Sequence, residues 1–516
     1  MRLIIVHYHL RPGGVRKVIE SATPFLLREM PEISRVVVAT GEARDVEWNV
    51  AFQRSCAPVP VEWFVDPALR YVSEQRVLAM LGRRIRSALK PLLAGDGEAC
   101  VWAQNLSVAR NLPLASELVR ACELRKIPLL LHHHDWWFDN RWLRWPEMQR
   151  TGFHTLRAAA EAVLPRASVV RFATINRADA TVLRRHFGSR AGWLPNPSPR
   201  SSIPTAVRIR RAREWLRELV GGDAPVWLLP CRLLRRKNVA EALLLTRWLR
   251  PGATLVVTGG ASSADEIPYA EKLLTTAREQ GWPMIAGALD GSDAGRPSVA
   301  ELMAASECVL LTSIQEGFGF PFLEAAASAR SLIARRLPNI APDLAKFGFA
   351  FPQCYRDVWI APALFDWSAE TRRQRMLFRE WKAVLPPACR GRCEPLPLQR
   401  NSRLRPLAFS RLTLAGQLEV LAHQAEESWK MCAPLNSLLV EWKALAASQM
   451  LQAAPWPASA ERWLGGGAYA RRLADMLRRI PSRMVGRDAG LAVQEDFIRE
   501  KLRAPHVFPL LCQRGS

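Results

Sequence analysis

Short apolar runs alternate with amphipathic stretches through the first two hundred residues. The apolar runs are four to eight residues long, the length of buried strands, and turn-forming residues separate them from the helical patterns. The predicted strands cover residues 3–9, 35–40, 100–104 and 128–134, and the predicted helices cover about 14–28 and 114–125. Strands that alternate with helices predict an α/β fold, in which helices cover both faces of a parallel sheet.

A second α/β series follows a proline- and serine-rich stretch over 194–204, which is typical of an interdomain linker. Its predicted strands cover 225–230, 254–258, 283–286 and 308–312, and a helix is expected between Cys231 and Leu249. The series ends near Pro352, and the clearest helices beyond it cover 367–385 and 412–430. The pattern predicts domains over 1–200 and 221–352, followed by a helical extension over 353–516.

The composition is that of a folded, reduced protein. Apolar residues make up 49% of the 516 residues and charged residues 23%, which excludes a disordered chain. No apolar run reaches the roughly 18 residues of a membrane span, and the first apolar run is too short for a signal peptide. The ten cysteines are scattered, and Cys389 and Cys393 have no second pair nearby to complete a zinc site. We therefore expect a cytoplasmic protein without a bound metal.

The net charge of +24 is compatible with nucleic acid, an anionic membrane surface or anionic substrates as partners. No basic tail, zinc finger or RNA-binding motif accompanies the charge, so nucleic-acid binding is not expected. Residues 76–93 form a basic amphipathic helix. A helix packed on the sheet is the favoured interpretation, and peripheral contact with the inner membrane face is the alternative.

The stretch QEGFGFPFLEAAAS places Glu316 and Glu324 on either side of a glycine-rich loop. Gly317 and Gly319 let the backbone approach a ligand, and a helix that begins at Pro321 offers unpaired N–H groups to an anion. We expect Glu316 at the end of a strand and Glu324 in the first turn of the helix, as acceptors for sugar hydroxyls. The alternative is a capped helix with solvated glutamates.

Two cations follow another predicted strand, Arg232 at once and Lys237 five residues later, directly before Asn238. Arginine and lysine side chains that converge on phosphates stabilise the negative charge that grows on a leaving group. An isolated pair of this kind would more simply be two surface cations. Here the pair precedes the two glutamates in the chain.

These motifs, in this order, resemble glycosyltransferase family 4, the retaining enzymes whose GT-B fold has two Rossmann-like domains around a cleft. The resemblance spans roughly residues 1–350 and rests on E-x(7)-E at 316–324 and R-x(4)-K-N at 232–238. It implies that Glu324 binds the ribose of a nucleotide and that Arg232 and Lys237 bind the diphosphate. It also implies that Glu316 and the backbone of Gly317, Phe318 and Gly319 hold the donor sugar.

The N-terminal half carries two more parts of the resemblance. The Arg11-Pro-Gly13-Gly14 loop resembles the family's glycine-rich loop, whose backbone lies against the diphosphate and the acceptor. It lacks the G-x-G-x-x-G spacing of dinucleotide binders, so a nicotinamide enzyme fits poorly. The family also has a His-Asp pair at a strand end beside the acceptor and the donor sugar, and His134-Asp135 matches it.

The histidine triplet leaves open which of His132, His133 and His134 lies in the site. In a strand, His132 and His134 share a face and His133 points away. A metal site would need a further ligand on that face, and the spacing provides none. At least one of the three is expected to be a buried, hydrogen-bonded histidine.

A tryptophan-rich segment follows, with Trp136, Trp137, Trp142 and Trp145 close to polar residues. Aromatic faces beside hydrogen-bonding groups suit a sugar ring, so a carbohydrate platform is one interpretation, and packing in the core is the other. The expected acceptor-binding residues are Asp135, Trp136, Trp137, Asp139, Asn140 and Arg141.

Taken together, the sequence predicts a retaining transferase that moves a hexose from a nucleotide diphosphate sugar to the hydroxyl of a saccharide, small molecule or lipid-linked glycan. The predicted catalytic residues are His134, Glu316, Arg232 and Lys237, and the only co-substrate is the nucleotide sugar. Family members that glycosylate lipids dock through a basic helix such as 76–93, and part of the extension is expected to pack on the N-terminal domain. The alternative is a non-catalytic GT-B protein that binds carbohydrate or nucleotide.

Overall fold

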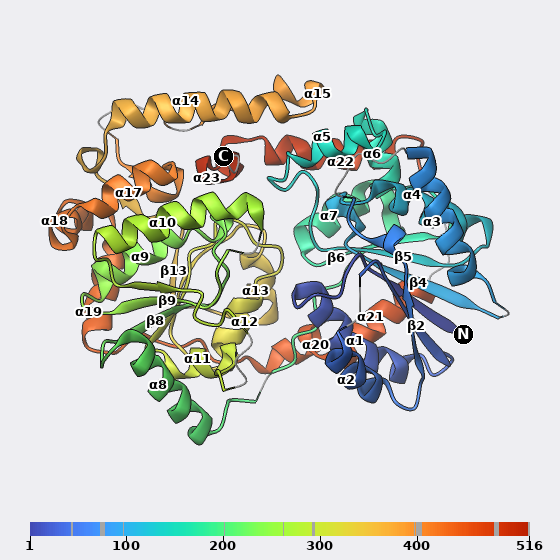
Figure 1. The fold of residues 1–516 in the computed structure, drawn as a ribbon, viewed down its shortest axis with the longest axis horizontal. Helices are drawn as coiled ribbons and strands as arrows, with labels where there is room; N and C mark the ends of the chain where they lie inside the picture. Colours follow the sequence, from blue (N-terminus) through green and yellow to red (C-terminus); the bar gives the residue numbers. More distant parts are fainter. Residues whose placement is uncertain are drawn as a thin grey trace. The chain divides into compact units, whose positions relative to one another are not determined.

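The computed structural model describes residues 1–42, 45–72, 78–95, 97–200, 202–261, 263–291, 295–396, 398, 405–478 and 485–513 (Figure 1). The chain forms two compact units. The N-terminal unit contains Met1–Pro199, Val384–Arg392 and Ser459–Leu502. The C-terminal unit contains Arg200–Ala383, Cys393–Ala458 and the stretch from Arg503 onward. The helical extension is therefore divided between the two units.

The N-terminal unit is built on a seven-stranded parallel sheet with the order β3-β2-β1-β4-β5-β6-β7. Its strands are β1 Arg2–Val6, β2 Arg35–Thr40, β3 Val61–Val65, β4 Ala99–Gln104, β5 Leu129–His133, β6 Val170–Thr174 and β7 Ala191–Trp193. Most strand residues are buried, as expected where helices cover both faces of a parallel sheet (Figure 1). The longer helices are α1 Gly14–Glu29, α2 Val46–Cys56, α3 Leu78–Leu93, α4 Leu112–Leu124, α6 Leu156–Val163 and α7 Arg177–Phe187.

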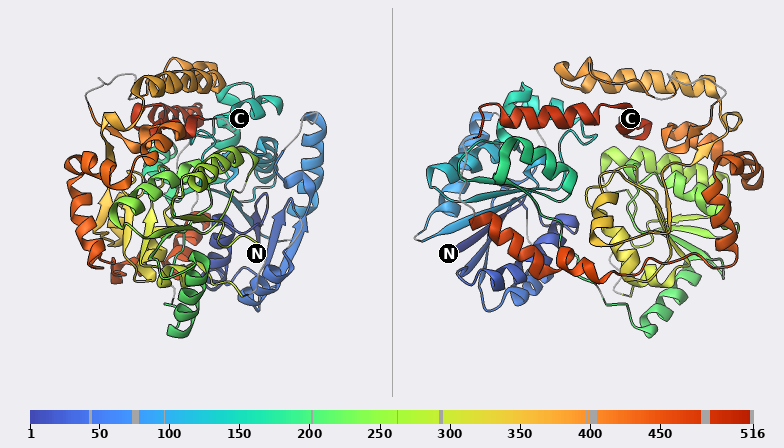
Figure 2. Two further views of the ribbon diagram at one scale, coloured as in Figure 1. Left: turned by 60° about the vertical axis from the view of Figure 1, so that its left-hand side comes forward. Right: turned by 180° about the vertical axis from the view of Figure 1, so that it is seen from behind.

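Two late helices complete the N-terminal unit, α21 (Gly466–Arg478) and α22 (Ala489–Lys501). Helix α21 packs on α1, and α22 packs on α6 and α7 (Figure 2). Polar contacts fix α22, because the indole of Trp137 donates to Gln494 over 3.2 Å and Arg157 pairs with Asp488 at 2.6 Å. Residues 459–502 therefore belong to the same compact unit as residues 1–199, although more than two hundred residues of the other unit lie between them in the chain.

The C-terminal unit has a six-stranded parallel sheet with the order β10-β9-β8-β11-β12-β13. Its strands are β8 Val226–Leu229, β9 Thr254–Val257, β10 Met284–Ala286, β11 Cys308–Leu311, β12 Leu332–Arg335 and β13 Gln353–Tyr355. The main helices are α8 Ala206–Val220, α9 Val239–Leu249, α10 Ile267–Glu279, α11 Val299–Ala305, α12 Phe320–Ala327, α13 Ala341–Phe347, α14 Trp367–Val384, α17 Leu414–Ala422, α18 Ala425–Cys432 and α19 Ser437–Ala447. A two-stranded antiparallel sheet pairs β14 (Trp359–Ile360) with β15 (Leu407–Ala408).

Both large sheets have the doubly wound strand order, which confirms the prediction of two Rossmann-like folds. In such sheets the loops diverge at the point where the strand order reverses, and ligands bind there, beyond the carboxyl ends of the strands. That point lies between β1 and β4 in one unit and between β8 and β11 in the other. The loops that follow these four strands are therefore where each unit would hold a ligand.

Two predicted helices have different boundaries in the structure. The helix expected from Cys231 begins only at Val239, because Asn238 has the left-handed conformation, with φ 49°, and interrupts regular helical hydrogen bonding. The helix expected over 412–430 is divided into α17 and α18, because His423 and Gln424 have extended backbones. The pattern also did not single out β3, β6, β7, β12 and β13.

Helix α3 covers most of the predicted basic helix, and residues 76 and 77 lie outside the described residues. Its apolar side chains, among them Ile85 and Leu89, are buried against the rest of the unit, and Arg83, Arg84 and Lys90 are exposed. This arrangement is what the packing interpretation predicts. Contact between the exposed cations and an anionic surface stays a prediction. Within the described ranges, no helix is both long enough and apolar enough to span a bilayer.

Candidate functional site

The loop after β8 exposes Arg232. This loop lies against two glycines that follow β9. A Cβ atom at Gly259 would lie 3.0 Å from Arg232 Cγ, and the Leu233 N–H donates to the Gly260 carbonyl over 3.1 Å. Arg232 is exposed and makes no hydrogen bond or ion pair with any residue that the structure describes. Its guanidinium is therefore available to an anionic ligand at the switch point of the C-terminal sheet.

Lys237 and Glu316 meet at the same switch point. Glu316 lies in the loop after β11, with 12% of its side chain exposed, and its carboxylate pairs with Lys237 and with Arg236 Nη1 at 3.0 Å. The Ser313 hydroxyl donates to the same carboxylate over 2.7 Å. Burial raises the pKa of Glu316, but the charges of Lys237 and Arg236 outweigh burial and lower this pKa to about 2. Glu316 is therefore ionised throughout the neutral range.

Side chains hold the loops that follow three adjacent strands in one arrangement. The Thr312 hydroxyl, just after β11, donates to the Lys237 carbonyl over 2.9 Å. The Asn339 amide, beyond β12, donates to the Glu316 carbonyl over 2.8 Å. Sequence reasoning missed Asn339, which belongs to no motif and lies near Glu316 only because β12 is the neighbour of β11.

The glycine-rich loop leads into α12 through Gly319, whose φ of 86° favours glycine. A Cβ atom there would also lie 3.1 Å from the Ile340 side chain. The Phe318 side chain is buried and its ring lies 6.5 Å from that of Phe347, so Phe318 offers only its backbone to a ligand.

Neither glutamate lies where the pattern predicted it: Glu324 is displaced by one helical position, and Glu316 lies five residues beyond the end of β11. Helix α12 begins at Phe320, one residue before Pro321, so Glu324 is the fifth helical residue rather than a first-turn residue. Strand β11 ends at Leu311, so Glu316 lies in the loop and not at the strand end. Glu324 is half-buried.

In the N-terminal unit, the carboxyl ends of β1, β4 and β5 bring His7, Gln104 and His134 together. His7 Nδ1 lies 3.0 Å from the Gln104 carbonyl oxygen, and His134 Nε2 lies 2.9 Å from Gln104 Oε1. The contact between His7 and Gln104 spans the switch point between β1 and β4. His134 is the first residue beyond β5, where the resemblance placed the family histidine.

The other two histidines of the triplet belong to β5. His132 and His134 have ring centroids 4.4 Å apart, whereas His133 faces Trp136 and Phe172, as strand alternation predicts. Burial lowers the pKa of His133 to about 3 and that of His134 to about 4, so both rings are neutral near pH 7. His133 makes no hydrogen bond to any described residue and is a core side chain.

Asp135 and Arg141 form the polar rim of this edge. Asn105, just after β4, accepts hydrogen bonds from the His134 and Asp135 N–H groups over 3.1 and 2.9 Å, and its amide donates to Asp135 Oδ2 over 3.2 Å. Arg141 Nη2 lies 3.2 Å from Asp135 Oδ1, and both side chains are about one-third exposed. Asn105 has a left-handed backbone, with φ 56°, which turns its side chain toward β5.

The tryptophans predicted as a carbohydrate platform lie in the core. Trp136, Trp137, Trp142 and Trp145 are each no more than 4% exposed. The Trp136 indole donates to Asp179 over 2.8 Å. The structure therefore favours the packing interpretation, because rings this deeply buried have no face to offer a sugar.

Asp139, also expected at the acceptor, pairs with Lys501 at the end of α22 at 2.5 Å. Lys501 is thereby held between the loop after β5 and the last helix of the unit. Asn140, beside it, has a left-handed backbone with φ 53° and continues the turn toward Arg141. Of the six expected acceptor residues, Asp135, Asn140 and Arg141 stay partly exposed, the side chain of Asp139 is 12% exposed, and the two tryptophans are buried.

Replacing Trp137 with alanine should destabilise the N-terminal unit by about 3–5 kcal/mol, because the substitution leaves a large cavity in the core. The measurement is chemical denaturation of the full chain. Trp359→Ala is a matched control, since Trp359 is 41% exposed and its loss should change stability little. A Trp137 variant with unchanged stability but a raised KM for acceptor would restore the platform interpretation.

The predicted glycine-rich loop leads directly into α1. Gly13 is the N-cap residue of α1, Gly14 is its first residue, and no acidic side chain lies in the first turn. No acidic side chain of the first turn therefore competes for the first N–H groups of this 16-residue helix. Arg11, at the start of the loop, pairs with Glu42 at 2.7 Å.

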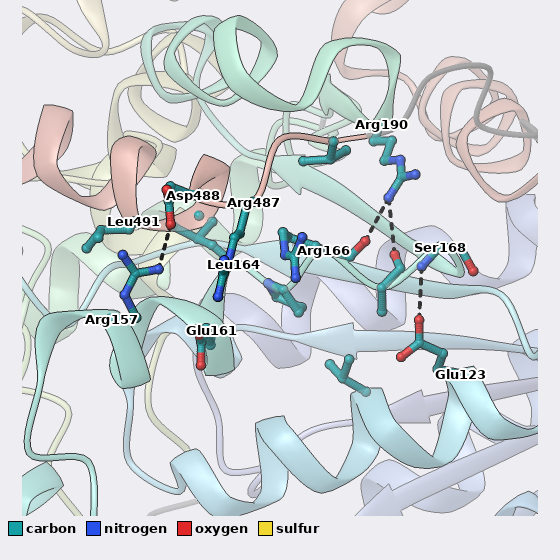
Figure 3. A pocket seen from close by; sticks show the side chains of 15 residues that line it. Glu123, Arg157, Glu161, Leu164, Arg166, Ser168, Arg190, Arg487, Asp488 and Leu491 are labelled. Carbon is teal, nitrogen blue, oxygen red and sulfur yellow. Dashed lines mark hydrogen bonds and ion pairs between the residues drawn. The ribbon is translucent and has the colours of Figure 1, made fainter.

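A hollow of about 520 Å³ lies at the opposite edge of the N-terminal sheet (Figure 3). It is lined by residues that precede β6 and β7, among them Arg166 and Arg190, and by the start of α22. Its arginines are accompanied by Glu123, Glu161 and Asp488, and Arg157 pairs with Asp488. None of the predicted site residues lines this hollow.

The cysteines are free thiols, and Cys389 and Cys393 belong to different units. Within the described ranges, no three histidine, cysteine or carboxylate side chains are grouped as metal ligands.

Comparison with known proteins was made by sequence and by fold. No protein-family model matches the chain. The chain is similar to mannosylglucosyl-3-phosphoglycerate synthase of Petrotoga mobilis, with 23% identity over 349 residues, and the match covers 66% of this chain. It covers 65% of that relative, which is less than two-thirds of the relative's length.

Among solved structures, Anabaena Alr3699/HepE in complex with UDP has a TM-score of 0.50 and 15% identity, over 92% of this chain and 99% of that chain. WaaG, a glycosyltransferase involved in lipopolysaccharide biosynthesis, has a TM-score of 0.45 and 15% identity, over 93% of this chain and 100% of that chain. The strand order and the similarity to the Alr3699/HepE structure agree on the fold. The chain has a GT-B-like architecture, with two doubly wound α/β units.

Proposed function

We propose that the chain is a retaining glycosyltransferase that moves a hexose from a nucleotide diphosphate sugar to an acceptor hydroxyl. The observation that carries the proposal is the meeting of Lys237 and Glu316 at the switch point of the C-terminal sheet, beside the exposed cation of Arg232, which pairs with none of the described residues.

The C-terminal unit would hold the donor. Arg232 and Lys237 would bind the diphosphate, and Lys237 would exchange its contact with Glu316 for the phosphate oxygens. Glu316 would then be free to accept the hydroxyls of the donor sugar, together with the backbone of 317–319. Glu324, five residues into α12, would accept the ribose hydroxyls.

The N-terminal unit would provide the acceptor side. His134 is neutral and its Nε2 bonds to Gln104, so it would act as a hydrogen-bond partner of the sugar rather than as a cation. Asp135 and Arg141 would bind the acceptor, and the N–H groups that open α1 would bind phosphate. As Gly13 and Gly14 open that helix, their backbone would lie against the donor.

In the proposed reaction, the bond between the anomeric carbon and the phosphate oxygen breaks, and a bond from the same carbon to the acceptor oxygen forms. Attack on the face of the departing diphosphate retains the configuration, and a diphosphate oxygen takes the acceptor proton. The protein would contribute by stabilising the charge on the diphosphate through Arg232 and Lys237.

The nucleotide is best identified by thermal shift with UDP, GDP and ADP and their glucose and mannose esters, because a ligand that binds the native state raises its Tm. UDP is the first choice, since the solved structure of Alr3699/HepE is a complex with UDP. A saccharide, small-molecule or lipid-linked acceptor can then be sought with the donor that binds.

Replacing Glu324 with alanine should weaken binding of the nucleoside diphosphate by roughly 10- to 100-fold, because the ribose loses a charged acceptor worth about 1.5–3 kcal/mol. Calorimetry measures this affinity. Glu316→Ala is the matched comparison: it should spare the affinity, because it frees Lys237 for phosphate, and it should damage transfer.

Unchanged nucleotide affinity in the Glu324 variant would remove that residue from the ribose site. Nucleotide binding without hydrolysis or transfer of any sugar ester would instead favour the non-catalytic alternative.

A further inference from the structure

A buried carboxylate lies directly behind the candidate donor site. Glu241 is the third residue of α9 and is completely buried. Arg335 Nη2 donates to its Oε2 over 2.5 Å and contacts Oε1 as well, and the Tyr355 hydroxyl donates to Oε1 over 2.6 Å. Asn238 Nδ2 donates to Oε2 over 2.8 Å. Burial raises the pKa of Glu241, and the charge of Arg335 and the hydrogen bonds from Arg335 and Tyr355 oppose that rise.

The guanidinium of Arg335 is buried as well, at the last position of β12. Its second terminal nitrogen, Nη1, donates to Asp357 over 3.0 Å and to the Arg356 carbonyl over 2.5 Å. The guanidinium carbon lies 5.2 Å from the centre of the Tyr355 ring. The Glu241–Arg335 pair therefore joins the start of α9 to the ends of β12 and β13.

Stability alone gives a weak reason for such a pair. Removing two charges from water is costly, and well-packed apolar residues of similar volume often serve the fold as well or better. A buried ion pair is better explained when it fixes one conformation of its surroundings. The position of this pair points to the conformation of the loop that carries Lys237 and Asn238.

Asn238 connects the pair to Lys237, which precedes it in the chain. Asn238 has a left-handed backbone with φ 49°, and its side chain is held from both sides. Its amide donates to Glu241, and its Oδ1 accepts from Gln417 Nε2 over 3.0 Å. Thr312 Oγ1 lies 3.1 Å from the Asn238 carbonyl and 2.9 Å from that of Lys237. The backbone that carries the Lys237 side chain is thus fixed on each side.

Arg335 also lies close to the loop that carries Glu316, the partner of Lys237. It lines a small hollow together with Ser313, Glu316 and Gly319. Arg335 therefore borders the loop that carries Glu316 and, through Glu241 and Asn238, supports the loop that carries Lys237.

We propose that Glu241 and Arg335 are positioning residues, which act through Asn238 to hold the Lys237 ammonium where it meets the diphosphate of the donor. The inference rests on the proposed function, because it assigns Lys237 to that diphosphate. Neither residue touches the ligand. Their effect on binding passes through Lys237.

This coupling separates positioning from general support of the fold. A positioning pair matters only for the ligand group that Lys237 binds. Its loss should therefore weaken the binding of a nucleoside diphosphate and leave the binding of the parent nucleoside unchanged. Its loss should also have no further effect once Lys237 is alanine, because two residues that act through one contact do not add.

The test is a double-mutant cycle of Lys237→Ala with the paired substitution Glu241→Leu/Arg335→Met. The ligands are UDP and uridine, or the corresponding pair if GDP or ADP gives the larger thermal shift. We expect the paired variant to lose about tenfold or more in diphosphate affinity, the range of one charged hydrogen bond, with nucleoside affinity unchanged. In the Lys237→Ala background, the paired substitution should change neither affinity.

Two further variants make the test independent of folding. Asn238→Gly removes the side-chain link, while glycine accepts the left-handed conformation without strain, and it should reproduce the selective loss of diphosphate affinity. The matched control is Arg250→Met/Glu307→Leu, a partly buried ion pair of the same unit with an N–O distance of 2.9 Å, at the opposite edge of the sheet. It should leave both affinities unchanged.

Equal losses for diphosphate and nucleoside, or losses that add to that of Lys237→Ala, would overturn the inference and leave the proposed function standing. A Lys237→Ala variant that binds the diphosphate as tightly as the wild type would instead overturn the assignment of the donor site itself.

Discussion

Replacing Lys237 with alanine should lower kcat by about 10²-fold or more, because the ammonium stabilises charge that grows on the diphosphate in the transition state. Arg232→Ala should have an effect of similar size. The fold-loss in kcat of the double variant should be smaller than the product of the two single fold-losses, since both cations act on the same phosphates. The measurement is steady-state transfer, or hydrolysis of the nucleotide sugar, with the donor found by thermal shift.

Stability must be measured on the same preparations, because Lys237→Ala removes one partner of the buried Glu316 carboxylate. Arg236 and Ser313 remain in contact with that carboxylate, so the fold should persist. Lys272→Ala, at an exposed position on α10, is the control for loss of a positive charge and should keep full turnover. Full turnover in both Lys237→Ala and Arg232→Ala would place the active site elsewhere.

The N-terminal unit should lose stability steeply as the pH falls below 6.5. Burial lowers the pKa of His7 and His133 to about 3 and that of His134 to about 4, and it lowers the pKa of His132 well below its ordinary value. In the unfolded chain these groups bind protons near pH 6.5, so the unfolded state takes up more protons than the folded state below that value. The stabilising contribution is complete above 6.5 and is lost between 6.5 and the folded pKa values.

Each such histidine changes the free energy of unfolding by up to about 1.4 kcal/mol per pH unit within that window. Denaturation at pH 7, 6, 5 and 4 measures the slope. His133→Phe removes one titrating group from a site that already has aromatic neighbours, so it should reduce the slope by one proton. An unchanged slope in that variant would show that His133 is protonated in the folded state.

The sequence predicted well what is encoded locally. The strands before the two motifs of the C-terminal unit, the cation-bearing loop and the glycine-rich loop are each a continuous stretch. The resemblance of these two stretches to the motifs of glycosyltransferase family 4 is what assigned Lys237 and Glu316 to one site. In the structure the two residues meet because β8 and β11, the strands before them, are neighbours in the sheet.

Contacts between strands that are neighbours in the sheet but distant in the sequence could not be predicted from local patterns. Arg335 and Asn339 follow a strand that the pattern did not single out, and nothing in their own neighbourhood marks them as partners of Glu241 and Glu316. The carbohydrate-platform interpretation of the tryptophan-rich segment was wrong for a related reason. Its polar neighbours suggested a surface loop, but Lys501 and Gln494 come from the far end of the chain to cover it.

The participation of Ser459–Leu502 in the N-terminal unit also sets an order of events during synthesis. Helices α1, α6 and α7 leave the ribosome long before the helices that cover them. Their apolar faces therefore stay uncovered while the middle of the chain is made. Domains usually fold as units from the N-terminus onward, but here the N-terminal unit cannot be completed before residues 459–502 have been made. The C-terminal unit is completed later still, because it also contains the stretch from Arg503 onward. Until α21 and α22 are made, the faces of α1, α6 and α7 on which they pack stay uncovered, a state in which folding chains are prone to aggregate.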